Sequence, residues 1–236
     1  SVNSSYSEAR WQQAPTLLSD AETARMAALF EERLNLPYSL CWHLASLGLN
    51  DETIADFLDP RLRTSLPDPY VMKDAERAIN LIKDVIKNKQ PIGLFGDYDV
   101  DGACSAALFR LVLGAFGVPV WCHIPDRFKE GYGPNLKALR ALKAQGAELV
   151  LTVDCGITAY APLAAAAEEG MSVIVIDHHK AGVVLPRAEA VVNPNRIDDD
   201  SGLGHLCAAA VCFLVLAGVV RVCRAQGITD QTGQLP

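Results

Sequence analysis

The sequence predicts an α/β protein with a mostly parallel sheet and helices on both faces, preceded by a small helical N-terminal region. Two observations support this fold class. Between residues 74 and 195, short apolar segments alternate with segments whose apolar residues have helical spacing, as in consecutive βαβ units. Three of the apolar segments end in an aspartate, at Asp97, Asp154 and Asp177, and the carboxyl ends of parallel strands share one edge of a sheet.

The first 65 residues lack this alternation. A helix is expected over residues 19–34, because Ser19 is a typical N-cap residue and apolar residues follow it at helical spacing. A second helix is expected over residues 50–60, with Asn50 as its N-cap and Pro60 as its stop. Residues 64–74 form the expected linker. We therefore predict a helical appendage over residues 1–65 and one α/β domain over residues 66–236.

The elements of the α/β domain follow from periodicity and from glycine and proline positions. The predicted strands are residues 91–99, 118–125, 148–156, 172–179 and 189–195, and the predicted helices are residues 74–89, 103–117, 135–146 and 158–170. The apolar segment 205–223 is nearly long enough to span a membrane. His205 and Arg221 interrupt it, which favours a buried core helix and no association with membranes.

Composition and charge limit the kinds of protein and of binding site that the sequence allows. The 236 residues are 50% hydrophobic and carry a formal charge of −7, and the N-terminus lacks the basic start and apolar run of a secretory signal. The seven cysteines form no C-x-x-C pair, which argues against a zinc ribbon and favours free thiols in the cytoplasm. Nucleic-acid binders are usually basic, but cations bound to carboxylates would supply positive potential here.

Acidic residues and histidines gather at the predicted strand ends. They are Asp97, Asp99 and Asp101 after the first strand, Asp154 after the third, and Asp177, His178 and His179 after the fourth. So many carboxylates at one edge repel each other unless some are protonated or divalent cations lie between them. Carboxylate and imidazole ligands suit manganese, magnesium or zinc. A single strand-end aspartate such as Asp101 is usually only an N-cap, but three such strand ends favour a metal site.

Four motifs, DYDVDG, VDCG, DHH and NPNR, occur in this order and resemble the first motifs of the DHH phosphoesterase superfamily. The segments FLDPRL, LPDPYVMKDAERA, IPDRFKEGYG and TVDCGI are similar to its 5′→3′ exonucleases specific for single-stranded DNA. The similarity covers roughly residues 51–211. It implies two manganese or magnesium ions held by Asp99, Asp101, Asp154 and His178, with Asp97, Asp177 and His179 as further ligands or as their hydrogen-bond partners.

The residues themselves leave some of these roles open. Asp177 is a candidate to orient an imidazole, and His179 either binds a metal or donates to phosphate. The resemblance implies that Arg127 faces the phosphates of the nucleic acid. Lys129 and Tyr132 lie in the same basic loop and are candidates to bind phosphate and to stack on a base, the alternative being a solvated loop. Arg196 follows a strand end and is a candidate phosphate contact or a surface charge.

The predicted activity is metal-dependent phosphodiester hydrolysis, in which two cations activate a water and Asp99, Asp101, Asp154, His178 and His179 form the catalytic centre. The resemblance implies a 5′→3′ exonuclease on single-stranded DNA that serves DNA repair and recombination in the cytoplasm, with a single-strand-binding protein and a helicase as partners. It also implies a further metal motif like TVADV and a second domain, which do not occur before Pro236, so an N-terminal portion is expected.

Three alternatives remain at this point. One is a phosphoesterase of the same superfamily that acts on oligoribonucleotides, cyclic dinucleotides or pyrophosphate. Another is a signalling receiver domain, which also gathers aspartates and magnesium at strand ends but has no need of a DHH motif. The third is a DHH-like binding protein without catalytic activity.

Overall fold

The computed structural model describes residues 17–235, so residues 1–16 of the predicted appendage lie outside the described part. The chain divides into two compact units between Leu66 and Pro67. The first contains α1 (Asp20–Leu34), α2 (Tyr38–Ser46), α3 (Ile54–Leu58) and α4 (Leu62–Ser65). Its small core is built around Ala27, Phe30, Cys41, Leu44 and Ile54.

In this unit, the predicted N-cap of the first helix is confirmed and the predicted N-cap of the next one is wrong. Ser19 caps α1 in a reciprocal arrangement, because Ser19 Oγ accepts from Glu22 N–H and the Glu22 carboxylate accepts from Ser19 N–H. Asn50 was expected to cap the next helix. Its side chain instead accepts from the N–H groups of Glu52 and Thr53, in a turn that precedes α3. The sequence pattern also missed α2.

The second unit is built on a parallel sheet. Within residues 67–235 the sheet has five strands in the order β2-β1-β3-β4-β5, and every neighbouring pair is parallel. Their bounds are β1 Ile92–Gly96, β2 Val120–His123, β3 Leu149–Val153, β4 Ser172–Ile176 and β5 Ala190–Val192. Each predicted strand is present but shorter, because the residues at its ends belong to the connections.

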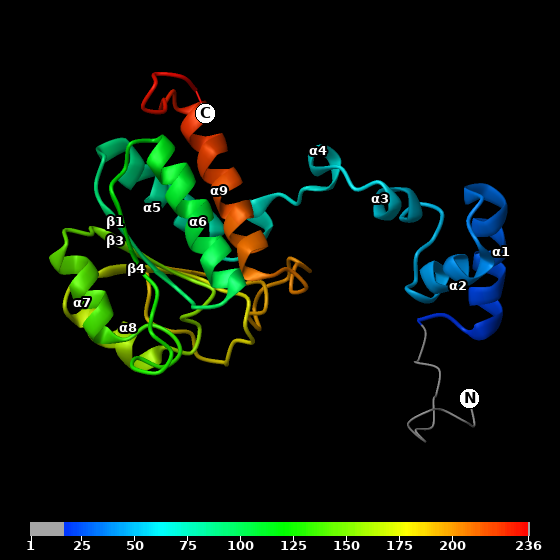
Figure 1. Ribbon diagram of the computed structural model, residues 1–236, viewed down its shortest axis with the longest axis horizontal. Coiled ribbons are helices and arrows are strands. Elements are labelled where there is room, and N and C mark those ends of the chain that lie inside the picture. Colours follow the sequence, from blue (N-terminus) through cyan, green and yellow to red (C-terminus); the bar gives the residue numbers. More distant parts are fainter. Residues whose placement is uncertain (1–16, 236) are drawn as a thin grey trace. The chain divides into compact units, whose positions relative to one another are not determined.

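Helices cover both faces of this sheet (Figure 1). On one face, a core cluster joins the strands to α5 (Ala75–Asn88), α6 (Val100–Ala115) and α9 (Ala208–Ala225). On the other face, a second cluster joins them to α7 (Leu136–Ala144) and α8 (Tyr160–Glu168). A short 3₁₀ helix, η1 (Pro69–Val71), precedes α5. The predicted α/β class with helices on both faces is confirmed.

The most apolar segment forms α9, which by length and composition is long enough to span a membrane, with 50% of it buried within the protein. Its buried residues include Val211, Val215 and Val219, and it packs against α5 and α6. Gly218 makes the close approach to α5 possible, because a Cβ there would overlap the Ile79 side chain. The apolar surface of α9 thus has a partner inside the fold, as a core helix requires.

The turn after β1 is tighter than expected. The next helix, α6, begins at Val100 and not at Ala103, because Asp99 Oδ1 accepts from Gly102 N–H at 3.0 Å and acts as the N-cap. Gly102 is needed here, since a Cβ would lie 2.5 Å from the Asp97 carbonyl oxygen. This turn places Asp101 in the first turn of α6, with its side chain free to reach another element.

Candidate metal centre

Asp154, directly after β3, is the most constrained residue at the carboxyl end of the sheet. Its backbone has a φ of 59°, a left-handed conformation that is uncommon for a non-glycine residue. The residue is 1% exposed, and no described residue donates a hydrogen bond to Oδ1. Burial, followed by the charges of Asp101 and Asp99, raises the pKa of Asp154 to about 8. A cation beside Asp154 would remove this penalty.

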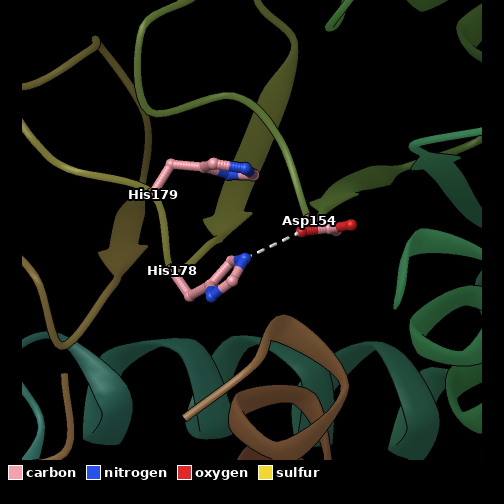
Figure 2. Close-up of side chains that lie close together, drawn as sticks. All are labelled: Asp154, His178 and His179. Atoms are coloured by element: carbon pink, nitrogen blue, oxygen red, sulfur yellow. Dashed lines mark ion pairs between the residues drawn. The ribbon is translucent and has the colours of Figure 1, made fainter. Parts of the chain in front are cut away.

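The other predicted ligands converge on Asp154 from two sides. One group of possible metal-binding atoms combines Asp154 with His178 and His179, and a second combines it with Asp97 and Asp99. Within each group the atoms lie no more than 4.8 Å apart. Figure 2 shows the two imidazoles reaching the strand end from the next connection, with His178 Nε2 3.4 Å from Asp154 Oδ1. Asp154 is therefore shared between an imidazole group and a carboxylate group.

A backbone contact fixes the His178 ring. Its Nδ1 lies 3.1 Å from the Leu206 carbonyl oxygen, and because a carbonyl only accepts, Nδ1 must carry the proton. The lone pair of a neutral His178 is then on Nε2, which lies 3.4 Å from Asp154 Oδ1 and 3.6 Å from Asp101 Oδ2. His178 is thus oriented as a metal ligand. The sequence held no signal for this contact, because the acceptor is a main-chain carbonyl.

Asp177, which follows β4, is buried beneath the two histidines and fully hydrogen-bonded. Its Oδ1 accepts from His179 Nδ1 and His178 N at 2.7 Å and from His179 N at 3.2 Å, while Oδ2 accepts from Ile157 N at 3.0 Å. These donors occupy the carboxylate. Asp177 therefore holds the His179 ring with Nε2 facing away from it, an arrangement that favours orienting an imidazole over binding a metal.

The three aspartates after β1 differ in pKa and in their hydrogen-bond partners. Burial raises the pKa of Asp97, which is 4% exposed. The hydrogen bond from Gly102 N–H lowers the pKa of Asp99. Asp101 accepts from Ala208 N–H and Ala209 N–H at 2.8 and 2.7 Å, so it caps α9 from a distance of more than 100 residues. Of the described carboxylates at this turn, Asp97 and Asp99 share a ligand group with Asp154.

The predicted substrate loop lies beside the same strand ends. Tyr132 Oη lies 3.4 Å from both the Asp154 carbonyl oxygen and His179 Nδ1. Burial and the negative charge of Asp177 raise its pKa, so the phenol stays neutral. Tyr98, which the sequence analysis missed, packs edge to face with Tyr132 and lies 5.5 Å below the Arg127 guanidinium. Its place between two strand-end aspartates was the available signal.

Two basic residues have different surroundings. Lys129 is exposed and pairs with Asp126 at 3.1 Å, so its side chain is accessible to solvent. Arg196 is 9% exposed, and its guanidinium donates to Asp74, Asp198 and the Val191 carbonyl oxygen. Arg196 was a candidate phosphate contact or a surface charge, and the structure shows instead a buried side chain that joins the start of α5 to the edge strand β5.

The oxygen and nitrogen atoms available as metal ligands at these strand ends suit hard divalent cations. Carboxylate oxygens with one or two imidazole nitrogens match magnesium or manganese, and an unpartnered buried oxygen at Asp154 is the feature that a bound cation would satisfy. The residues available to hold such ions are Asp97, Asp99, Asp101, Asp154, His178 and His179. Asp101 would do so while it caps α9.

The chain is similar to several curated exonucleases. It is 43% identical over 146 residues to the single-stranded-DNA-specific exonuclease RecJ of Bacillus subtilis, covering 62% of this chain and 19% of the relative. It is 34% identical over 161 residues to the RecJ of Escherichia coli, covering 68% of this chain and 28% of the relative. The chain therefore spans less than a third of the length of these relatives.

Solved structures agree with the fold. A crystal structure of exonuclease RecJ bound to manganese matches 64% of this chain and 38% of its own, with a TM-score of 0.58 and 34% identity. The Mn²⁺ complex of RecJ from Thermus thermophilus matches 88% of this chain and 28% of its own, with a TM-score of 0.64 and 28% identity. The family model described as DHH family, N-terminal domain, matches residues 91–232. The parallel sheet, its strand-end acids and this match over more than half of the sequence place the chain in the DHH family.

Proposed function

We propose that this chain binds two divalent cations, Mn²⁺ or Mg²⁺, and hydrolyses phosphodiester bonds as part of a 5′→3′ exonuclease acting on single-stranded DNA. The observation that carries this proposal is Asp154, a buried aspartate in a left-handed conformation with an unpartnered Oδ1. Imidazoles and carboxylates from two other strand ends surround it. Strained, buried, unsatisfied carboxylates are retained where function requires them.

The residues of the chain have separate tasks in this proposal. Asp97, Asp99, Asp101, Asp154 and His178 are the proposed ligands, and His179 lies in the same group of possible ligands as His178. When bound, the cations would polarise the phosphate and lower the pKa of a bound water. Asp177 orients His179, and the Leu206 carbonyl orients His178. His179 Nε2 is left available to bind a cation or to donate to phosphate.

The loop that carries Arg127 and Tyr132 supports contact with a nucleic acid at this site. Arg127 presents a guanidinium over Tyr98, and such a planar fork matches phosphate. Phe128 is 97% exposed, which leaves its ring free to stack on an unpaired base. Lys129 and Tyr132 extend the same loop. We propose that this loop guides the strand towards Asp154.

The wider setting belongs to the same proposal and is supported by the resemblance to RecJ proteins. It comprises a role in DNA repair and recombination, a single-strand-binding protein and a helicase as partners, and a cytoplasmic location, where the free cysteines would stay reduced. It also comprises a DHH domain over residues 66–236 behind an N-terminal appendage.

The test is cation-dependent nucleotide release by this chain. We expect Mn²⁺ to support hydrolysis of single-stranded DNA blocked at its 3′ end and not of DNA blocked at its 5′ end. Asp154→Asn should abolish the release, while Asp56→Asn, an exposed residue in the first unit, should leave it unchanged. Calorimetry that detects no Mn²⁺ or Mg²⁺ binding would refute the metal centre. Faster hydrolysis of short RNA, cyclic dinucleotides or pyrophosphate would reassign the substrate within the family.

A further inference from the structure

The NPNR segment follows β5, and the proposed function gives its asparagines no task. Both asparagine side chains reach back to the DHH segment. Asn193 Nδ2 donates to the His179 carbonyl oxygen at 2.9 Å, and Asn195 Nδ2 donates to the His178 carbonyl oxygen at 2.5 Å. Each histidine therefore has its main chain held by one asparagine.

Asn195 makes a second contact that connects both ends of His178. Its Nδ2 also donates to the Gly204 carbonyl oxygen at 3.1 Å. Two residues further on, the Leu206 carbonyl accepts from His178 Nδ1. The Asn195 amide thus links the His178 main chain to the segment that holds the His178 ring. It fixes the His178 main chain relative to the Leu206 carbonyl, and these two together set the direction of His178 Nε2.

The orientation of the Asn195 amide follows from its partners. Nδ2 faces two carbonyl oxygens, which only accept hydrogen bonds, so the NH₂ group must be on this side. The Asn195 main chain is held in turn, because its N–H donates to Asn193 Oδ1 at 2.7 Å. Gly204 leaves room for the amide, since a Cβ there would lie 2.6 Å from Asn195 Oδ1.

The segment that contains Asn193 and Asn195 is anchored to the rest of the fold by Arg196, the residue that follows Asn195. Arg196 is buried and donates to Asp74 at 2.8 Å and to the Val191 carbonyl at 2.7 Å. Asp74 also accepts from Val191 N–H at 3.0 Å, so the edge strand is fixed immediately before the asparagines. The position of Asn195 is therefore set by buried contacts and not by a free loop.

We propose that Asn195 is a positioning residue for His178: it locks the ring with Nδ1–H towards Leu206 and Nε2 towards Asp154 and Asp101. The proposal rests on the proposed function only in treating His178 as a metal ligand. Partners that orient a ligating histidine typically change metal affinity 10- to 100-fold when removed. The Asn195 side chain acts through His178 and contacts neither the proposed cations nor the substrate.

The test combines the tautomer of His178 with cation affinity. In the metal-free wild-type protein at about pH 8.5, where imidazole is neutral, long-range ¹H–¹⁵N spectra should show His178 protonated on Nδ1. Asn195→Ala should give a mixture of tautomers and weaken Mn²⁺ binding about 10- to 100-fold. Asn195→Asp should act more strongly, because a carboxylate would replace a donor facing two carbonyls.

Two matched variants make the result specific. Asn193→Ala removes the contact to His179, whose ring stays bonded to Asp177, and also removes the acceptor of the Asn195 N–H. The His178 tautomer should therefore change less than in Asn195→Ala. Asn80→Ala, on α5, removes a half-buried amide that donates to the Glu76 carbonyl of its own helix. Both the His178 tautomer and the Mn²⁺ affinity should match the wild type. Gly204→Ala should reproduce part of the Asn195→Ala effect, since it displaces the same amide.

Several outcomes would overturn the proposal. They are a wild-type His178 protonated on Nε2, or an Asn195→Ala protein that keeps both the Nδ1–H tautomer and the wild-type Mn²⁺ affinity. If Asn195→Ala does not fold, exchange of the Asn195 side-chain amide protons in the wild type decides, since they should exchange more slowly than those of Asn80. The tautomer needs no cation or DNA, so failed hydrolysis by the wild type would refute the proposed function and leave this result standing.

Discussion

Asp154 and Asp177 occupy equivalent places at the ends of neighbouring parallel strands, β3 and β4, and they are 1% and 0% exposed. Their surroundings are opposite. Asp177 accepts four hydrogen bonds from the chain, whereas Asp154 has a left-handed backbone and an Oδ1 without a donor among the described residues. A buried carboxylate is stable when its acceptors are filled. The described residues supply donors to both oxygens of Asp177 and leave Asp154 Oδ1 without one, where a cation can bind.

Removing Asp177 should produce the largest loss of stability. Asp177→Ala leaves the buried N–H of Ile157 and the partly buried N–H groups of His178 and His179 without their acceptor. We expect the free energy of unfolding to fall by about 3–5 kcal/mol. Urea denaturation of the metal-free proteins measures this change. A loss below about 1 kcal/mol would contradict the structural role that distinguishes Asp177 from Asp154.

The corresponding change at Asp154 should have the opposite sign for stability. Above about pH 8, where Asp154 is ionised, Asp154→Asn removes a charge that faces Asp99 and Asp101, so the metal-free protein should be more stable by about 1 kcal/mol. The same variant should lose more than about 100-fold in Mn²⁺ affinity, because it loses a ligand itself and not merely a partner of one. Thermal unfolding with and without Mn²⁺ checks both effects. If Asp154→Asn were destabilised and still bound Mn²⁺, the contrast between Asp154 as a metal ligand and Asp177 as a structural residue would be wrong.

The stability of the metal-free protein should depend on pH through Asp154. Its pKa is about 8 in the folded chain, compared with about 3.9 in an unfolded chain. Between these values the folded state binds more protons at this group, so the free energy of unfolding should fall as the pH rises from about 4 to about 8. Saturating Mn²⁺ should oppose this fall, because it binds the ionised carboxylate. Denaturation curves of wild type and Asp154→Asn should differ in slope over this window.

Tyr132 connects the two strand ends and should show the smallest effect. Its hydroxyl lies 3.4 Å from the Asp154 carbonyl oxygen and from His179 Nδ1. Because these bonds are long, Tyr132→Phe should reduce the free energy of unfolding by less than about 1 kcal/mol. Urea denaturation measures it. A larger loss would mean that the proposed substrate loop stabilises the strand ends and does not merely lie beside them.

The sequence was sufficient to predict the convergence of acids and histidines because that prediction depends on local patterns. Alternating apolar segments specify a parallel sheet, and a parallel sheet brings its carboxyl ends together whatever the connections contain. The strand ends at Asp97, Asp154 and Asp177 therefore followed from periodicity. Helix bounds were less accurate, because α6 starts where Asp99 caps it, three residues before the start that the apolar pattern indicated.

The roles of individual charged side chains did not follow from the sequence. Arg196 was expected at phosphate and is bonded to Asp74, 122 positions away. Asp101 caps α9 across 107 positions, where the chain offers Cys207 and no oxygen-bearing side chain at the cap position. Such pairings depend on which elements the fold brings side by side, and sequence spacing carries no information about them.

By itself, the sequence determined the α/β class, the edge of the sheet where acids meet and the motifs that mark the family. The tertiary structure decided which carboxylate accepts hydrogen bonds from the chain and which keeps an oxygen without a donor, because that depends on where main-chain N–H groups point. Asp177 accepts from four donors, whereas Asp154 Oδ1 has no donor among the described residues. The difference is set by backbone geometry at two strand ends, which residue type alone does not encode.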